Sequence, residues 1–381
     1  MLEKVKKEHG LDGDNLAARE DVARQIEKLL ATQLPGCDVT IFGSSLSGFG
    51  LRSSSVDLKL GLPAECSPSK GMVTAAKTLR EVFEEVFEDF HGQVKEFPIS
   101  CVLNVDLSLL QVPVITFSTA GVSYRLSLVL QASVDTSLLL KDYMDLDCRV
   151  HLLGVALRCW ARQVKVEGGG GLPSHALSLL LVSFLQKQAV LPCIHTWLEP
   201  GAKVYNSPRE MLQAWKTENE VSPAELWVDL FRWLALGLRG EGVISICGEE
   251  EKTDFKGKRL TIEDPFASKK NLCSNMSQAA LDHLADCFKA SYLYFGSLQT
   301  TLGPIIEVLV PHYEPEEVDD AAEFVTTTDD SEVEVSKPVD DSLEAWLAHR
   351  GTSLTLAEAA MAEQLVSGWE YLSHQSSLLG R

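Results

Sequence analysis

The sequence predicts an α+β protein, in which a small mixed β-sheet precedes a larger helical region. Three observations support this prediction. Short apolar runs bounded by Gly, Pro and Ser, which are typical of strands, occur in the first third of the chain. From about residue 136 onward, apolar residues recur at helical spacing instead. The composition, 45% hydrophobic and 23% charged over 381 residues, is typical of a globular protein with two or three domains.

Helices and strands alternate in the first third of the chain. Residues 15–34 predict a helix with Ile26, Leu29 and Leu30 on one side, which Pro35-Gly36 end. Residues 69–90 predict a second amphipathic helix. The strand-like runs are 38–42, 56–62, 99–110, 112–117 and 122–130.

The rest of the chain is mainly helical. The predicted helices are 136–145, 147–165, 174–188, 208–216, 223–238, 277–295 and 296–310, and short strands are predicted at 243–247 and 259–262. The four glycines of 168–171 favour a flexible loop over a phosphate cradle, because the G-x-x-x-x-G-K-[ST] pattern is absent.

Charge and composition limit the function classes. A net charge of −20 argues against a general nucleic-acid binder, because affinity for the phosphate backbone comes from Lys and Arg. About a dozen acidic residues lie between residues 314 and 344 with Lys337 as the only base, a pattern typical of a linker. Without that segment the chain is only mildly acidic, which leaves room for a local basic surface.

The sequence favours a reducing, intracellular setting. No run approaches 18 apolar residues and the first residues lack an apolar signal core, so we expect a cytoplasmic protein without membrane contact. The nine cysteines are scattered and form no C-x-x-C, so neither a disulfide framework nor a zinc site is indicated.

The segment from Thr40 to Leu60 has the outline of a phosphate-handling turn. An apolar run ends in Gly43-Ser44, a Gly/Ser-rich segment follows, and a second apolar run carries Asp57. Such a glycine lets backbone N–H groups approach phosphate oxygens, and the serine adds a hydroxyl. Alternate strand residues then aim carboxylates at a metal ion. This arrangement is typical of nucleotidyl transfer.

The carboxylates that this chemistry needs are mostly missing. An Asp-x-Asp pair is expected, but Ser55 stands at its first position and only Asp57 remains. At the place of a third carboxylate, on run 122–130, stands the cation Arg125. One aspartate cannot arrange two magnesium ions. Taken alone, Asp57 is most simply a solvated strand-end residue.

Five motifs in order resemble the nucleotidyltransferase core of the noncanonical poly(A) polymerases and terminal uridylyltransferases. They are Gly43-Ser44 with LRSSSVD ending at Asp57, VPV at 112–114, RCWAR at 158–162, GGLPSHA at 170–176, and TIEDPF at 261–266 with Asn271. The resemblance covers about residues 5–300 and implies a polymerase-β-like nucleotidyltransferase sheet domain with a helical, PAP-associated central domain.

Within this family, three features resemble the N-terminal, catalytically inert module of animal zinc-finger terminal uridylyltransferases. They are KEHG at 7–10, Arg125, and PCIHTWLE at 192–199. The resemblance implies binding of RNA, as a precursor microRNA or an mRNA 3′ end. It also implies a partner protein with cold-shock and zinc-knuckle domains.

We expect five parts of the chain, of which the resemblance implies the first three, and acidic composition and helical periodicity indicate the last two. These are an N-terminal helical part of the central domain at 1–36, the nucleotidyltransferase domain at 37–132, the central domain at 133–310, an acidic linker at 311–344 and a C-terminal helical segment at 345–381.

Site residues follow from the same resemblance. Asp57 matches a metal-binding carboxylate, and the implied nucleotide contacts, partly remnants, are Gly43, Ser44, Thr136, Arg158, Arg162, Ser174, His175, Glu263, Asp264 and Lys270. Several positions depart from the family pattern: Asp135 replaces a ribose-binding asparagine, His175 a base-stacking tyrosine, and Lys270 a uracil-reading histidine.

Simpler interpretations stay open for these residues. Arg158 and Arg162, four apart on one helix face, are often a solvated face. Ser174 is well placed to cap its helix, and Glu263-Asp264 before Pro265 suits a turn.

Two functions therefore compete. The favoured one is an inert transferase fold that binds RNA and a partner and needs no cofactor. The alternative is an active terminal uridylyl- or adenylyltransferase that uses Mg²⁺ or Mn²⁺, with Asp106 or Asp135 as a substitute ligand. A third and weaker possibility is an interaction module that uses only the C-terminal helical segment.

Overall fold

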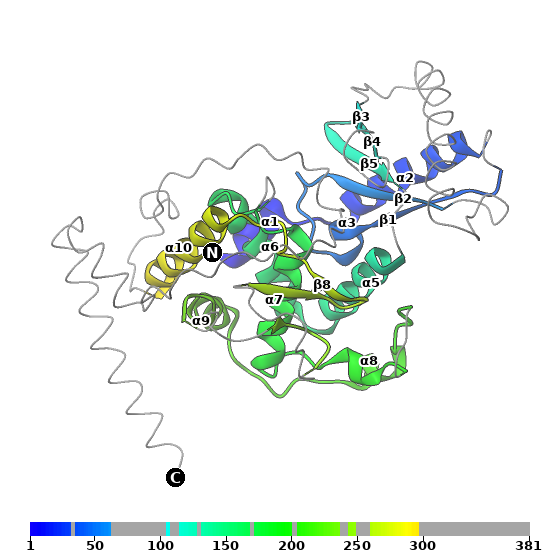
Figure 1. The fold of residues 1–381 in the computed structure, drawn as a ribbon. Helices are drawn as coiled ribbons and strands as arrows, with labels where there is room; N and C mark the ends of the chain where they lie inside the picture. The colour runs from blue at the N-terminus through cyan, green and yellow to red at the C-terminus, as the bar shows by residue number, and fades with distance from the viewer. Residues whose placement is uncertain are drawn as a thin grey trace, which may run out of the picture.

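The computed structural model describes residues 1–31, 35–61, 104–106, 114–127, 131–167, 171–199, 204–236, 243–248 and 260–296. Figure 1 shows a mixed sheet at one end and a mainly helical body at the other. The predicted α+β class is confirmed. The predicted helices 69–90 and 296–310, the acidic linker and the C-terminal helical segment lie outside the described residues, apart from the start of 296–310.

The larger sheet has the order β1-β2-β5-β4-β3. Its strands are β1 (Asp38–Phe42), β2 (Val56–Gly61), β3 (Asn104–Asp106), β4 (Val114–Thr119) and β5 (Val122–Ser127). Strands β2 and β5 run parallel, while the other neighbours are antiparallel. The β2–β5 register places Asp57 directly beside Arg125. Topology therefore brings together two residues that the sequence separates by 68 positions.

The N-terminal helices α1 (Leu2–His9) and α2 (Gly13–Leu30) pack in different cores, although both lie within residues 1–36. Helix α2 begins with a capping box in which Asp12 accepts a hydrogen bond from the Asn15 N–H at 2.8 Å. Its Ile26 packs with strand residues such as Leu58 in the core of the sheet. Leu2 of α1 instead belongs to the core of the helical body.

The helical body surrounds α7, whose middle, Ala176 to Leu185, is buried throughout and mainly apolar. Its elements are α5 (Gln131–Leu146), α6 (Cys148–Gln163), α7 (Ser174–Lys187), the 3₁₀ turn η1 (Ile194–Trp197), α8 (Arg209–Ala214), α9 (Pro223–Leu236) and α10 (Gln278–Gly296). A helix that is hydrophobic all round must be covered by neighbours. Within the described part of the chain, no helix combines the length and the apolar character that crossing a membrane requires.

Two local elements differ from the sequence-based expectation. The short helix α3 (Gly43–Ser47) forms where only a turn was expected. A second sheet, with the order β6-β7-β8, contains β6 (Val243–Ile244), β7 (Thr261–Asp264) and the unpredicted strand β8 (Ala267–Asn271). The β8 sequence, ASKKN, is polar, and it becomes a strand because it pairs with β7 across the turn at Pro265-Phe266.

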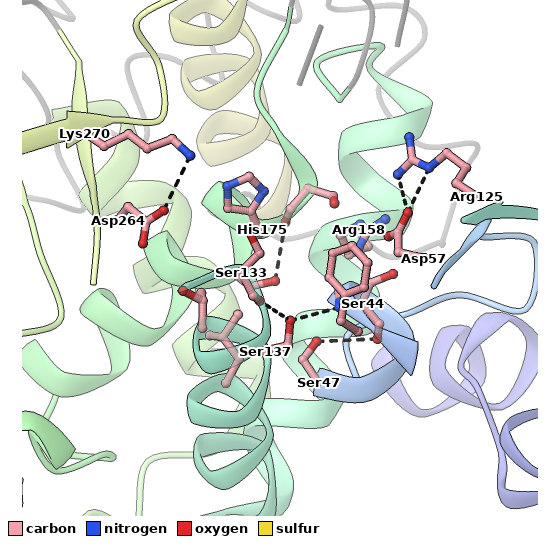
Figure 2. A pocket seen from close by; sticks show the side chains of 16 residues that line it. Ser44, Ser47, Asp57, Arg125, Ser133, Ser137, Arg158, His175, Asp264 and Lys270 are labelled. Carbon is pink, nitrogen blue, oxygen red and sulfur yellow. Dashed lines mark hydrogen bonds and ion pairs between the residues drawn. The ribbon is translucent and has the colours of Figure 1, made fainter. Parts of the chain in front are cut away.

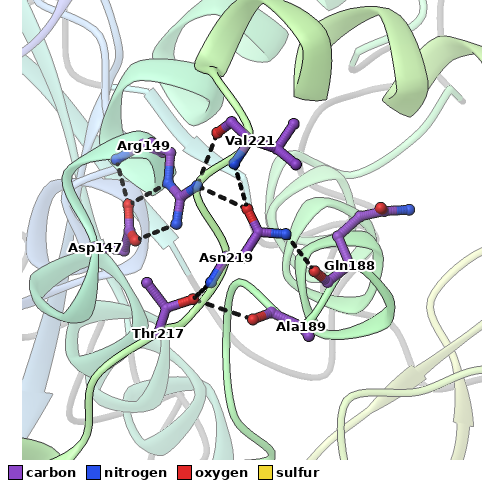
Figure 3. A network of polar contacts seen from close by, with 7 residues as sticks. All are labelled: Asp147, Arg149, Gln188, Ala189, Thr217, Asn219 and Val221. Carbon is purple, nitrogen blue, oxygen red and sulfur yellow. Dashed lines mark hydrogen bonds and ion pairs between the residues drawn. The ribbon is translucent and has the colours of Figure 1, made fainter.

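A polar network joins the segment before α9 to the start of α6 (Figure 3). The Arg149 guanidinium donates to Asp147 Oδ2 at 2.7 Å, to Asn219 Oδ1 at 2.9 Å and to the Val221 carbonyl at 2.8 Å. Asn219 in turn donates to the Gln188 carbonyl at 2.7 Å. The network gives hydrogen-bond partners to the Val221 and Gln188 carbonyls. It also ties the segment before α9 to the start of α6 and the end of α7.

Gly154 of α6 is required by close packing against Phe49, which follows α3. A Cβ atom at this position would lie 2.5 Å from two carbons of the Phe49 ring, and Phe49 is buried. We expect Gly154→Ala to lower the free energy of unfolding by about 1–3 kcal/mol, because the buried ring cannot move without disturbing its neighbours.

Gly13→Ala, at the first turn of α2, is the matched control. Nothing lies within 4 Å of the Cβ that this change would add. We expect a neutral effect or stabilisation by up to about 1 kcal/mol. Urea denaturation of both variants measures the difference, and equal stabilities would contradict the packing argument.

Candidate functional site

A pocket lies where the five-stranded sheet meets the helical body (Figure 2). Ten of the residues predicted for the site line it: Gly43, Ser44, Asp57, Arg125, Thr136, Arg158, Ser174, His175, Asp264 and Lys270. They come from eight elements between α3 and β8, so the sequence motifs converge in space. Ser55, Arg162 and Glu263 are not among the lining residues.

The Gly43 turn closes on Asp57. Gly43 has φ = +66°, and a Cβ here would lie 2.7 Å from Asp57 Oδ2, so glycine is needed both for the backbone angle and for the close approach. The Gly43 N–H, which the sequence suggested for a phosphate, donates to Ser137 Oγ at 2.9 Å instead. The Ser44 side chain lines the pocket.

Arg19 of α2 holds the Gly/Ser-rich segment in shape. Its buried guanidinium donates to Ser45 Oγ at 2.8 Å and to the Leu51 and Ser54 carbonyls at 3.1 and 3.2 Å. A guanidinium carries five N–H donors in a fixed planar geometry, so one arginine can bind several carbonyl groups of an irregular segment. This residue was not identified from the sequence, where it resembles any charged position of an amphipathic helix.

Asp57 is bound to Arg125 at the end of the pocket that the sheet forms. Asp57 Oδ1 accepts hydrogen bonds from Arg125 Nε at 2.8 Å and from Nη2 at 2.7 Å. The Asp57 and Arg125 side chains are 14% and 24% exposed, so the pair is largely shielded from water. The carboxylate that the sequence singled out as a metal ligand is thus paired with a cation of the protein.

The donor set does not fit a two-metal site. Ser55 lies just before β2 and offers at most a hydroxyl, and Asp57 Oδ1 is engaged by Arg125. Among the described residues, no group of three or more His, Cys, Asp or Glu side chains is placed to hold a metal ion. Asp135 is fully buried, accepts a hydrogen bond from Gln131 and does not line the pocket. The side chain of Asp106 lies outside the described part.

Arg158 is buried and Arg162 is exposed, and both contact Glu167. Arg158 Nη2 lies 2.6 Å from Glu167 Oε1, and Arg162 Nε lies 3.5 Å from Oε2. Arg162 also donates to Ser53 Oγ at 2.8 Å and Ser54 Oγ at 3.0 Å, outside the pocket lining. Of the two arginines, Arg158 lines the pocket and Arg162 does not.

Helix α7 points its first residues into the pocket. Pro173 is the N-cap and no side chain caps this end, so the interpretation of Ser174 as a capping residue is wrong. Ser174 and His175 line the pocket at the first turn. Burial lowers the pKa of His175 to about 4; Asp264 opposes this shift, while Lys270 and Arg158 add to it.

Asp264 and Lys270 form the opposite end of the pocket (Figure 2). Lys270 Nζ lies 3.7 Å from Asp264 Oδ2, and Asp264 Oδ1 accepts from the Phe266 and Ala267 N–H groups at 3.1 and 3.3 Å. The turn predicted at this position is confirmed for Asp264. Glu263 accepts a hydrogen bond from Ser245 Oγ at 2.8 Å and does not line the pocket, so its role as a nucleotide contact stays a prediction.

Several pocket residues were missed in the sequence. Ser47, Ser133, Ser137 and Ser178 add hydroxyl groups, and Phe42 and Leu140 add apolar surface. Ser133 and Ser137 are four residues apart on α5, and this spacing indicates that both lie on the same face of the helix. Glu167 belongs to none of the sequence motifs, and only the structure shows that it lies between Arg158 and Arg162.

The Asp57–Arg125 pair should be energetically coupled. In a double-mutant cycle with Asp57→Ala and Arg125→Ala we expect a coupling energy of about 1–2 kcal/mol, because the pair is shielded and held by two hydrogen bonds. The exposed pair of Asp21 and Arg24, 3.2 Å apart, is the control. Its coupling should stay below about 0.5 kcal/mol. Unfolding free energies measure both cycles, and equal couplings would refute the assignment.

The pKa of His175 should make stability depend on pH. Below pH 6.5 the unfolded chain gains a proton on this residue, while the folded chain resists it until about pH 4. The free energy of unfolding should therefore fall as the pH drops through this window, and His175→Gln should remove that part of the decline. His9→Gln, at an exposed site, is the control. A ring-proton titration by NMR with a midpoint near 6.5 would contradict the expectation.

Known proteins have sequences similar to that of this chain. Residues 1–110 match the TUTase nucleotidyltransferase domain. The chain is 26% identical over 347 residues to terminal uridylyltransferase 7 of Homo sapiens, a match that covers 77% of this chain and 22% of that protein. It is 24% identical over 369 residues to terminal uridylyltransferase 4 of Homo sapiens, covering 78% and 21%. The chain thus spans about a fifth of the length of these relatives.

Solved structures show the same fold. The structure of mtPAP in complex with UTP is 20% identical, with a TM-score of 0.64 over 78% of this chain and 68% of that one. A cytoplasmic RNA terminal U-transferase is 18% identical, with a TM-score of 0.63 over 78% and 94%. The family resemblance predicted from the motifs is confirmed: this chain carries a TUTase nucleotidyltransferase domain and is homologous to terminal uridylyltransferases 7 and 4 and to poly(A) RNA polymerases.

Proposed function

We propose that this chain is a catalytically defective, uridylyltransferase-like module that binds RNA and a partner protein. It would serve RNA 3′-end uridylation of microRNA precursors or mRNA in the cytoplasm. The observation that carries the proposal is the ion pair between Asp57 and Arg125 at the place where the family pattern expects metal-binding carboxylates.

The physical argument is electrostatic. Phosphoryl transfer of this kind places two divalent ions among several carboxylates, and here one carboxylate remains with a guanidinium in contact. A unit charge about 4 Å from a cation opposes it by about 4 kcal/mol at an effective dielectric constant of 20. Two divalent ions would meet a larger electrostatic penalty from Arg125. We therefore expect the inert module to act without a metal cofactor.

Support for RNA comes from the relatives, which are named as terminal uridylyltransferases and poly(A) RNA polymerases. A partner with cold-shock and zinc-knuckle domains follows from the family resemblance of the sequence. The alternative is an active RNA terminal uridylyl- or adenylyltransferase that uses Mg²⁺ or Mn²⁺. The retained Ser44, Asp57 and Ser174 at the pocket favour this second candidate.

A tailing assay separates the two functions. Purified protein is incubated with labelled RNA, Mg²⁺ or Mn²⁺ and each of the four nucleoside triphosphates. We expect no extension of the 3′ end, and Asp57→Ala should behave like the unchanged protein. Extension that Asp57→Ala abolishes would overturn the proposal and establish the alternative.

A binding assay tests the positive half of the proposal. A labelled single-stranded RNA should shift in a native gel to the same extent with EDTA and with Mg²⁺, because binding does not depend on a metal ion. Binding that EDTA abolishes would count against the inert module.

A further inference from the structure

A groove lies on the helical body where α1, α6, α9 and α10 meet. Its volume is about 450 Å³, and it shares no lining residue with the pocket at the sheet. Helices α9 and α10 are neighbours, and the N-terminus of the chain lies near them (Figure 1). The residues that give the groove its apolar surface are Leu2, Leu152, Trp227, Val228, Tyr294 and Phe295.

The floor of this groove is an aromatic cluster. The ring centres of Trp227 and Phe295 are 5.4 Å apart, and Phe231 stacks on Phe295 at 5.3 Å. Trp227 also meets Phe231 edge to face at 4.8 Å. Because these rings already hold one another in place, the apolar surface of the groove exists without a ligand.

The groove offers apolar surface and little charge. Among the described residues that line it, Glu3 carries the only charged side chain. The Ser222 hydroxyl at its edge donates to Glu225 Oε2 at 2.7 Å. A surface of this kind favours the burial of apolar side chains. The ligand class that fits is therefore an apolar peptide segment with few charges.

The sequence that follows α10 contains such a segment. Residues 304–310 read PIIEVLV, in which Glu307 is the only charged residue and the others are apolar. Helix α10 ends at Gly296, directly after Tyr294 and Phe295 of the groove. The seven residues between, 297–303, span at most about 25 Å when extended. The segment is therefore tethered within reach of the groove.

We infer that the groove between α1, α6, α9 and α10 is a docking site for residues 304–310 of the same chain. Ile306 and Leu309 supply apolar side chains that suit the aromatic floor. The acidic segment that begins at Glu314 would then leave the helical body from a fixed point. This contact lies away from the pocket, so it does not depend on whether the chain binds RNA.

A segment of the same chain has an advantage over a separate partner. The short tether keeps residues 304–310 at a high effective concentration at the groove, so docking costs less entropy than the binding of a second molecule. Left in water, the run PIIEVLV would expose a contiguous apolar surface, which is unfavourable. Docking removes both this surface and that of the groove from water.

The first test identifies the occupant by photo-crosslinking in the full chain. Ala224, an exposed residue that lines the groove, is replaced by p-benzoylphenylalanine. After irradiation of monomeric protein, mass spectrometry should find Ala224 peptides joined to residues 304–310. The same replacement at Met211, which is 50% exposed and outside the groove, is the control and should give no such product.

Two outcomes of this experiment would overturn the inference. One is the absence of crosslinks from Ala224 to residues 304–310. The other is a crosslink between molecules in a mixture of ¹⁴N- and ¹⁵N-labelled protein, which would show that a second copy of the chain occupies the groove instead.

The second test measures hydrogen exchange of the amides of residues 304–310. Val228→Glu places a charge in the groove, so these amides should exchange at least tenfold faster than in the unchanged protein, which corresponds to about 1.4 kcal/mol. Val204→Glu makes the same change at a residue that is 50% exposed and outside the groove. This matched control should leave the exchange unaltered.

Ile306→Glu tests the contact from the side of the segment, where the groove itself stays intact. It should lower the yield of the Ala224 crosslink at least tenfold while the circular dichroism stays unchanged. If residues 304–310 of the unchanged protein exchange as fast as a free peptide, or if Ile306→Glu leaves the crosslink yield unaltered, the docking site is wrongly assigned.

Discussion

The contact between Asp57 and Arg125 determines what the rest of the pocket can do. The two residues lie side by side because β2 and β5 are adjacent parallel strands, so their contact follows from sheet topology and register. Gly43 allows the neighbouring turn to approach the same carboxylate. Arg125 on β5 thus places a cation of the protein against the one carboxylate at this end of the pocket.

The same principle extends across the pocket. Each charged lining side chain has a counter-charge nearby: Arg125 with Asp57, Arg158 with Glu167, and Lys270 with Asp264. Burying a paired charge costs less free energy than burying an isolated one. The pocket can therefore contain charged side chains that are largely shielded from water. Arg19 holds the Gly/Ser-rich segment that forms one wall. The pocket therefore combines paired charges with a wall of hydroxyl groups.

Much of the fold could be predicted because its elements are strongly periodic. Helices such as α6 and α9 and strands β1, β2 and β5 carry apolar residues at clear spacing, and they form close to the expected bounds. Strand β8 was missed because its polar sequence becomes extended only by pairing with β7. Helix α3 was missed because Gly and Ser favour turns when read locally.

The sequence by itself determined the family, the α+β class and ten residues of the pocket, because motif spacing and residue chemistry are local properties. Only the tertiary structure decided which charges neutralise each other. It paired Asp57 with Arg125, placed Glu167 between Arg158 and Arg162, and kept Glu263 away from the pocket lining. The physical reason is that electrostatic energy depends on distance in space, and distance between remote residues is set by strand register and helix packing.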